Sequence, residues 1–129
     1  MSYLWVAIGG ALGSVARYFF SGVIANRFGA AFPNGTLFVN VTGAIVIGIF
    51  AALSLPEGRM TLPPPARLFL MTGICGGYTT FSTFSLETFN LLRDGEWTRA
   101  LANIALSVGL CLLAVWCGLI LGLRLGSRG

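Results

Sequence analysis

Residues 73–85 read GICGGYTTFSTFS, in which two adjacent glycines precede a stretch where five of seven positions are Ser or Thr. Glycines followed by side chains that compete for backbone hydrogen bonds favour a locally unwound helix. At membrane depth such a stretch is tolerated only inside protein or beside water. The segment therefore predicts an interrupted helix, whose exposed carbonyls and new helix N-terminus are groups from which ion sites are built.

This segment lies inside one of four long apolar runs, which cover about residues 3–24, 36–55, 66–92 and 100–123. The chain is 56% hydrophobic and only 9% charged, against about 25% charged residues in soluble domains. About 20 helical residues, rising about 1.5 Å each, cross a hydrocarbon core of about 30 Å. We therefore expect an all-α membrane protein in which residues 1–129 form a single domain of four transmembrane helices, the third broken near its middle.

Several residue patterns argue against a soluble, nucleic-acid-binding or catalytic protein. Arg17 interrupts the first run and no basic residue precedes it, so we expect a mature span rather than a cleavable signal peptide. The net charge of +4 comes from scattered arginines, which suit anionic lipid headgroups better than nucleic acid. Histidine is absent, and Cys75, Cys111 and Cys117 fall in apolar runs, where we expect small packing residues rather than metal ligands.

Basic residues are balanced between the two faces of the predicted four-span arrangement. Lys and Arg in short loops set the orientation of a membrane protein. One face would carry Arg59, Arg67, Arg124 and Arg128, and the other Arg17, Arg27, Arg93 and Arg99. Unless some other feature selects one orientation, this balance predicts that copies insert both ways round. An antiparallel homodimer follows, because a twofold pair is closed and self-complementary.

Glycine pairs spaced four apart predict where helices touch. Gly9 and Gly13 lie in the first run, and Gly118 and Gly122 lie in the fourth. In lipid, apolar side chains gain little by meeting another helix, so close backbone approach through small residues drives packing. We expect these two pairs to mark contact faces, without indicating a function.

Few polar side chains interrupt the apolar runs, and they share helical faces. Thr36, Asn40 and Gly43 share one face of the second predicted helix, and Asn103 and Ser107 share one face of the fourth. Interhelical hydrogen bonding is one explanation of such residues. A wet pathway through the protein is the other.

The third run adds groups that can bind an anion. Beyond the predicted break, Phe81 and Phe84 lie three apart on one helical face, and Glu87 ends the hydroxyl-rich stretch. Aromatic residues at this spacing are also common packing residues. Hydroxyls donate hydrogen bonds and ring edges carry partial positive charge, so both can replace the water of a small anion. Such neutral donors also let the ion leave, where a full positive charge can trap it.

Three segments together resemble one membrane-protein family. Residues 76–85, GGYTTFSTFS, resemble the third-helix signature of the fluoride channels of the Fluc type, also called the CrcB family. Residues 9–18, GGALGSVARY, resemble its first-helix motif, and residues 35–43, GTLFVNVTG, resemble its second. The motifs follow the family's order, and the resemblance covers the whole chain.

This resemblance implies a passive, fluoride-selective ion channel of the cell inner (plasma) membrane that exports fluoride from the cytoplasm. It further implies an antiparallel homodimer with two pores. The aromatic pair would contact the ion through ring edges beside a polar amide, and a hydroxyl track would continue the path. The pore residues implied are Phe81, Phe84, Asn40, Ser82, Thr83 and, through a looser fourth-helix motif, Ser107.

The same resemblance implies groups outside the narrow pore. Arg17 corresponds to an arginine of the family's vestibule, and Glu87 to an acid at the pore mouth. A structural sodium ion at the dimer centre would be bound by backbone carbonyls that correspond to Gly76 and Thr79. Two copies would each give two carbonyl oxygens, a ligand set suited to a hard cation.

Two other classes remain as alternatives. A small multidrug exporter also has four spans, but it needs a carboxylate inside the membrane to carry a proton, and Glu87 lies near the end of its segment. A noncatalytic assembly protein would explain the glycines but not the hydroxyl track. An enzyme is the least favoured class, because no nucleophile is paired with a base.

Overall fold

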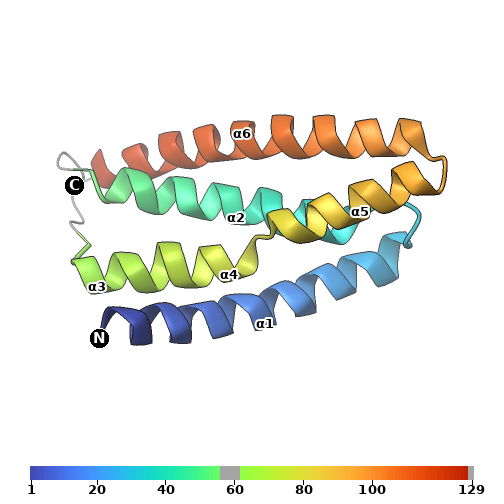
Figure 1. Cartoon of the computed structure of the whole chain (residues 1–129). Helices are drawn as coiled ribbons and strands as arrows, with labels where there is room; N and C mark the ends of the chain where they lie inside the picture. The colour runs from blue at the N-terminus through green and yellow to red at the C-terminus, as the bar shows by residue number, and fades with distance from the viewer. Residues whose placement is uncertain (56–61, 128–129) are drawn as a thin grey trace.

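The chain is all-helical over residues 1–55 and 62–127, which are those that the structure, a computed structural model, describes. Its helices are α1 (Ser2–Phe28), α2 (Asn34–Leu53), α3 (Pro64–Arg67), η1 (Leu68–Cys75), α4 (Gly76–Tyr78), α5 (Phe81–Arg93) and α6 (Trp97–Ser127). The π-helix η1 follows α3 and leads into α4 without a gap. Figure 1 shows the start of α1 and the end of α6 at the same end of the bundle.

Three of these helices, α1, α2 and α6, are long and apolar enough to cross a membrane. The predicted all-helical, multi-pass membrane architecture is therefore confirmed. The ends differ from the prediction, because α1 continues to Phe28 and α6 runs from Trp97 to Ser127. Hydropathy marks only the part of a helix that lies in hydrocarbon, and backbone hydrogen bonding carries the helix past it.

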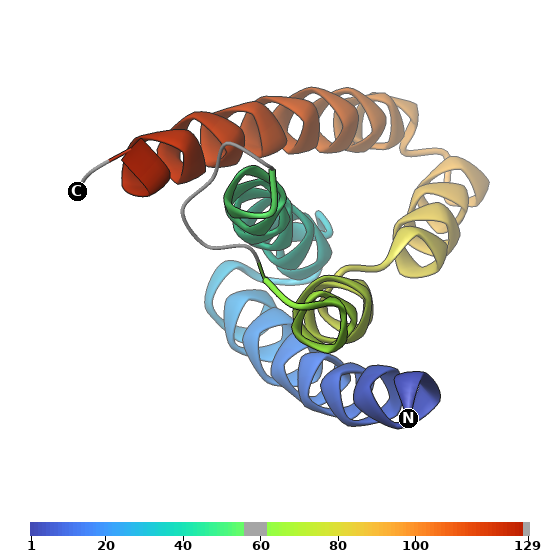
Figure 2. The ribbon, with the colours of Figure 1, turned by 90° about the vertical axis from the view of Figure 1, so that its left-hand side faces the viewer.

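Helix α2 lies in the middle of the bundle, with α6 on one side and α1 on the other (Figures 1 and 2). The contact between α2 and α6 depends on glycine. A Cβ atom added at Gly48 would stand 2.5 Å from the carbonyl oxygen of Val115, and one at Gly122 would stand 2.7 Å from that of Ile49. Gly118 is packed still more tightly against the Ile45 carbonyl. The predicted contact face at Gly118 and Gly122 is confirmed.

Helix α1 packs along η1 and α4 in the same manner. A Cβ atom at Gly13 would stand 2.9 Å from the backbone nitrogen of Tyr78, and one at Gly77 would stand 2.6 Å from the carbonyl oxygen of Gly10. Gly9 is also in close backbone contact with η1. The predicted contact face at Gly9 and Gly13 is thus confirmed, and glycine occurs on both sides of this contact.

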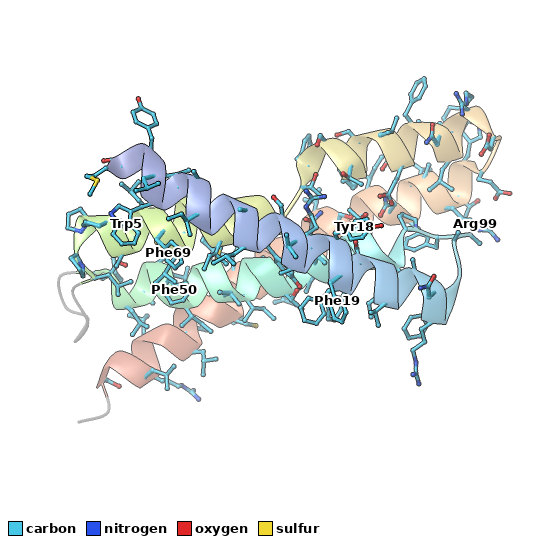
Figure 3. The ribbon with its side chains drawn as sticks, turned by 90° about the horizontal axis from the view of Figure 1, so that it is seen from below. Trp5, Tyr18, Phe19, Phe50, Phe69 and Arg99 are labelled. Atoms are coloured by element: carbon cyan, nitrogen blue, oxygen red, sulfur yellow. The ribbon has the colours of Figure 1, made fainter. Side chains whose placement is uncertain are left out.

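Large apolar side chains lie mainly outside the bundle, whereas the interior uses small ones. Figure 3 shows side chains projecting outward along α1, with Trp5 over Phe69; their rings meet edge to face with centroids 6.1 Å apart. The buried hydrophobic residues include Ala44, Ala52 and Ala114. This distribution suits a helix bundle in lipid, where small residues let backbones approach closely.

Extended backbone separates α4 from α5. Thr79 has φ −90° and ψ 155°, and Thr80 has φ −151° and ψ 115°. Gly76 is helical, with φ −64° and ψ −38°, so the helix runs through the glycine pair and ends at Tyr78. Beyond this extended pair, α5 departs from α1 and lies towards α6 (Figure 2).

Candidate functional site

The side chain of Asn40 on α2 is paired with the extended backbone at Thr80. Its Nδ2 donates to the Thr80 carbonyl oxygen at 3.2 Å, and its Oδ1 accepts from the Thr80 backbone nitrogen at 2.8 Å. An amide side chain has both a donor and an acceptor, so it satisfies both polar groups of one residue as a neighbouring strand would. Asn40 therefore stabilises the extended conformation from a different helix.

This pairing changes which carbonyls at the end of α4 have donors. Thr79 donates to the Cys75 carbonyl through both its backbone nitrogen, at 3.0 Å, and its Oγ1, at 2.9 Å. In a continuing helix the Thr80 N–H would bond the Gly76 carbonyl, but here it bonds Asn40. The Gly76 carbonyl thus loses its helical donor and is available to another ligand.

Hydroxyl groups gather at the start of α5. The Thr80 side chain caps the helix, because its Oγ1 accepts from the Thr83 backbone nitrogen at 3.2 Å. The same oxygen lies 3.1 Å from the Thr83 hydroxyl and 3.2 Å from that of Ser82. The structure therefore brings the predicted hydroxyl residues Ser82 and Thr83 together at the positive end of a helix, where negative charge is favoured.

Phe81 and Phe84 contact each other on α5 but lie in different surroundings. Their ring centroids are 5.4 Å apart and the rings are tilted by 47°. Phe84 is 9% exposed, whereas Phe81 is 78% exposed. A single copy of the chain buries one ring of the predicted pair and leaves the other open.

Ser107 belongs to a buried hydrogen-bonded chain that joins α6 to α5. Its Oγ donates to Asn103 Oδ1 at 3.3 Å, Asn103 Nδ2 donates to Thr88 Oγ1 at 2.8 Å, and Thr88 Oγ1 donates to the Phe84 carbonyl at 2.7 Å. The sequence analysis named Asn103 and Ser107 but missed Thr88. Thr88 follows Phe84 by four positions in the third apolar run, and the fourth run contains the polar Asn103. These two features are a signal that could have identified it.

A groove of about 450 Å³ runs between α2, η1, α4, α5 and α6. It is lined by backbone and side chains of the predicted site, together with apolar residues of α2 and α6. Six of the predicted residues border it, namely Asn40, Gly76, Thr79, Phe81, Phe84 and Ser107. The groove thus unites residues from three separate predicted spans.

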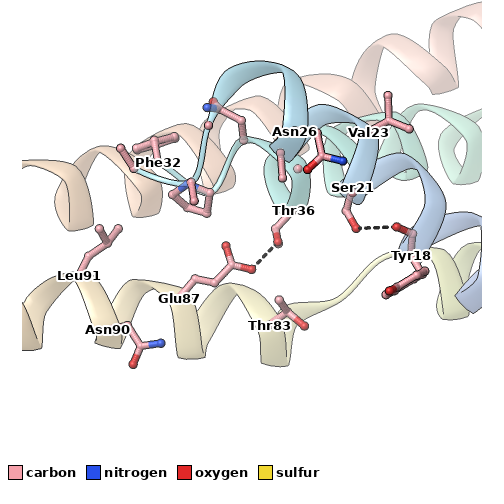
Figure 4. Close-up of a pocket in the computed structure, with 18 of the residues that line it drawn as sticks. Tyr18, Ser21, Val23, Asn26, Phe32, Thr36, Thr83, Glu87, Asn90 and Leu91 are labelled. Atoms are coloured by element: carbon pink, nitrogen blue, oxygen red, sulfur yellow. Dashed lines mark hydrogen bonds between the residues drawn. The ribbon is translucent and has the colours of Figure 1, made fainter.

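A second, larger cavity of about 1010 Å³ opens between α1, the start of α2 and α5. Figure 4 shows Glu87 of α5 accepting a hydrogen bond from the Thr36 hydroxyl of α2, with Thr83 one turn earlier on α5. Asn90 and Asp94 continue the lining towards the end of α5. Thr83 and Glu87 therefore face a different space from the one that Phe81 and Ser107 border.

Arg17 is directed to the end of α4. Its Nε donates to the Gly77 carbonyl oxygen at 3.0 Å, across 60 residues of sequence. The described residues that line the cavity beside Glu87 do not include Arg17. Arg17, expected in the vestibule, and Glu87, expected at the pore mouth, thus contact different parts of the protein.

Backbone oxygens are the available ligands for a cation in this site. Within residues 1–55 and 62–127, no three His, Cys, Asp or Glu side chains gather where a metal ion could be bound. Gly76 and Thr79 both border the groove of about 450 Å³ described above. The carbonyl released at Gly76 is a hard oxygen ligand of the kind that alkali and alkaline-earth cations prefer.

The fold and these contacts define a small multi-pass membrane protein with polar groups gathered at a helix interruption. A family model described as CrcB-like protein, Camphor Resistance (CrcB), matches residues 4–119. The chain belongs to this CrcB-like family.

Relatives with a stated function support the same grouping. The chain is 56% identical over 125 residues to a protein of Opitutus terrae named fluoride-specific ion channel FluC, covering 97% of this chain and 95% of that one. It is 55% identical over 118 residues to proteins of the same name from Methylocella silvestris and Rhodospirillum rubrum, covering 92% of this chain in each case and 90% and 92% of those proteins. These relatives are named as ion channels rather than enzymes.

Proposed function

We propose that the protein is a passive, fluoride-selective ion channel. The observation that carries the proposal is the grouping of neutral donors at the start of α5, next to two phenylalanine rings. There the Thr80 hydroxyl lies 3.2 Å from that of Ser82 and 3.1 Å from that of Thr83. A dehydrated halide needs donors that replace its water. The printed names of the relatives support fluoride as the ion.

The path of the ion would use both hollow spaces beside α5. An anion entering the larger cavity would meet Thr83 and then the hydroxyls at the helix start. It would continue along the edges of Phe81 and Phe84 in the groove that Ser107 also lines. The remaining hydrogen of the Asn40 amide would be its donor there, because the other hydrogen bonds Thr80. Glu87, bonded to Thr36, would mark the mouth.

An antiparallel homodimer with two pores would complete this path. The exposed ring of Phe81 and the apolar groove beside it are surfaces that a second copy would cover. The balance of four basic residues on each face supports insertion in both orientations, although Arg59 and Arg128 lie outside the described residues. Each pore would then use rings from both copies, and the Phe81 ring that one copy leaves exposed would be covered.

A structural sodium ion would sit between the two copies. The residues fit this ion, because Thr80 bonds Asn40 and so leaves the Gly76 carbonyl without its helical donor. Gly76 and Thr79 of each copy would supply the oxygens, on the side of α4 that faces the groove. The ion would offset the negative ends of two facing helices and so hold the copies together.

The channel would act in the plasma membrane of its cell and let fluoride leave the cytoplasm down its gradient. Purified protein in liposomes loaded with potassium fluoride tests this directly: with valinomycin present to balance charge, a fluoride electrode should record rapid efflux. Liposomes loaded with chloride should release none. Equal chloride release would contradict the proposal, and efflux that required a proton gradient would favour an exporter that uses Glu87 as its proton carrier.

A further inference from the structure

Arg17 lies in the row of α1 residues that faces η1 and α4. It follows Gly13 by four positions, and Gly13 follows Gly9 by four, so the three share one face of the helix. The two glycines bring α1 into backbone contact with the continuous helix formed by η1 and α4. One turn further on, this helix ends at Tyr78, and there the Arg17 side chain bonds the carbonyl oxygen of Gly77.

The bond that Arg17 makes is a helix-capping bond. The Gly77 carbonyl is one of the last carbonyls of the helix formed by η1 and α4. Its partner in a continuing helix would be the Phe81 N–H. Phe81 instead begins α5 after two extended residues. Arg17 Nε occupies the Gly77 oxygen at 3.0 Å. A cation at a helix C-terminus also interacts favourably with the helix dipole.

The two sides of the interruption are therefore stabilised from different helices. Asn40 of α2 bonds both polar groups of Thr80, and Arg17 of α1 bonds the Gly77 carbonyl. The Cys75 carbonyl accepts twice from Thr79. The Gly76 carbonyl differs from both. Its helical donor, the Thr80 N–H, bonds Asn40 instead, and Arg17 bonds Gly77 rather than Gly76.

We propose that Arg17 is a positioning residue that fixes the end of α4 at the helix interruption through its Nε–Gly77 carbonyl bond, and that this bond, rather than a free charge on the anion's path, is its role. The inference deepens the proposed channel function, because that interruption would supply the carbonyls for sodium and the start of the hydroxyl track. Lys cannot replace Arg in this role, since an ammonium group has neither the planar fork nor an Nε–H along the side chain.

Backbone exchange at the interruption is the measurement that separates the two roles. Hydrogen–deuterium exchange of the Thr79 and Thr80 amides, in full-length protein in lipid nanodiscs, reports whether their bonds to Cys75 and Asn40 persist. Both Arg17→Lys and Arg17→Gln should speed this exchange by about tenfold, which corresponds to about 1.4 kcal/mol, and lower fluoride flux by a similar factor. Arg27→Gln, which removes a charge near the end of the same helix, should leave exchange at Thr79 and Thr80 unchanged.

A role as a free charge predicts a different pattern. Arg17→Lys would then keep the flux, Arg17→Gln would lose it, and neither would change exchange at the interruption, which would overturn the proposal. A wild-type measurement covers the case in which the variants do not fold: with arginine labelled with ¹⁵N at Nε and glycine labelled with ¹³C at its carbonyl, solid-state NMR should detect one strong Arg–Gly dipolar coupling. Its absence would also overturn the proposal. Wild-type protein that shows the coupling but carries no fluoride would refute the channel function alone.

Discussion

The two halves of the third predicted span differ in how they are stabilised. The first half, from α3 to α4, packs closely on α1, and its η1 and α4 parts do so through glycine backbones. The second half, α5, touches α6 and α2 much less. It is anchored by two hydrogen bonds to its N-cap residue Thr80 and by one each at Glu87 and Thr88. The difference indicates that the first half is scaffold, whereas α5 presents its side chains to the two hollow spaces.

The largest expected effect follows from filling the glycine contact of the first half. Gly77→Val would place a Cβ atom 2.6 Å from the Gly10 carbonyl oxygen, and a backbone atom cannot move aside as a flexible side chain can. We expect a loss of more than about 3 kcal/mol, enough to prevent assembly. Size-exclusion chromatography of detergent-purified protein measures it. Gly109→Val is the matched control, since no atom of a neighbouring helix lies within 4 Å of a Cβ there, and it should elute as wild type does.

The next largest effect concerns conduction rather than folding. Phe81→Ile and Phe84→Ile should each lower fluoride flux in liposomes by about tenfold or more, equivalent to about 1.4 kcal/mol, because isoleucine has no electropositive ring edge. Phe89→Ile, also an exposed ring on α5 but outside the groove lining, should conduct normally. If all three variants conducted equally, the aromatic part of the proposed pore would be wrong.

A smaller effect is expected at the hydrogen-bonded chain that ties α5 to α6. Thr88→Val leaves the buried Asn103 amide without its acceptor, which should lower the free energy of unfolding by about 1–3 kcal/mol. Combining it with Asn103→Leu removes the orphaned amide and should cost less than the sum of the two single changes. Unfolding in mixed micelles gives the four values. Strict additivity would show that the bond does not couple the two helices.

The smallest effect is expected at the mouth of the larger cavity. Thr36→Val removes the hydroxyl that donates to Glu87, so the carboxylate would lose the bond that fixes its position at the mouth. Because solvent and salt screen charges in an open cavity, we expect fluoride flux to fall by less than about threefold. Thr36→Ser retains the hydroxyl and should conduct as wild type in the same efflux assay. A large loss in Thr36→Val would place Glu87 in the narrow part of the path instead.

Much of the architecture was predictable from local sequence. The four apolar runs located α1, α2, the α3–α5 segment and α6, and the spacing of glycines located the helix contacts. Both signals are local, because hydropathy over about 20 residues and a repeat of four depend on neighbours along one helix. The hydroxyl and aromatic residues of α5 were likewise recognisable as a group before their positions were known.

The sequence by itself therefore determined that this chain crosses a membrane and which faces its helices share, and it predicted which side chains could bind an anion. Only the tertiary structure decided that extended backbone occurs at Thr79 and Thr80 rather than at the glycine pair, that Arg17 bonds Gly77, and that Thr88 joins Asn103. The physical reason is that a backbone group released from a helix needs a partner, and here the partners, Asn40 and Arg17, come from other helices. No local pattern states which distant side chain will arrive.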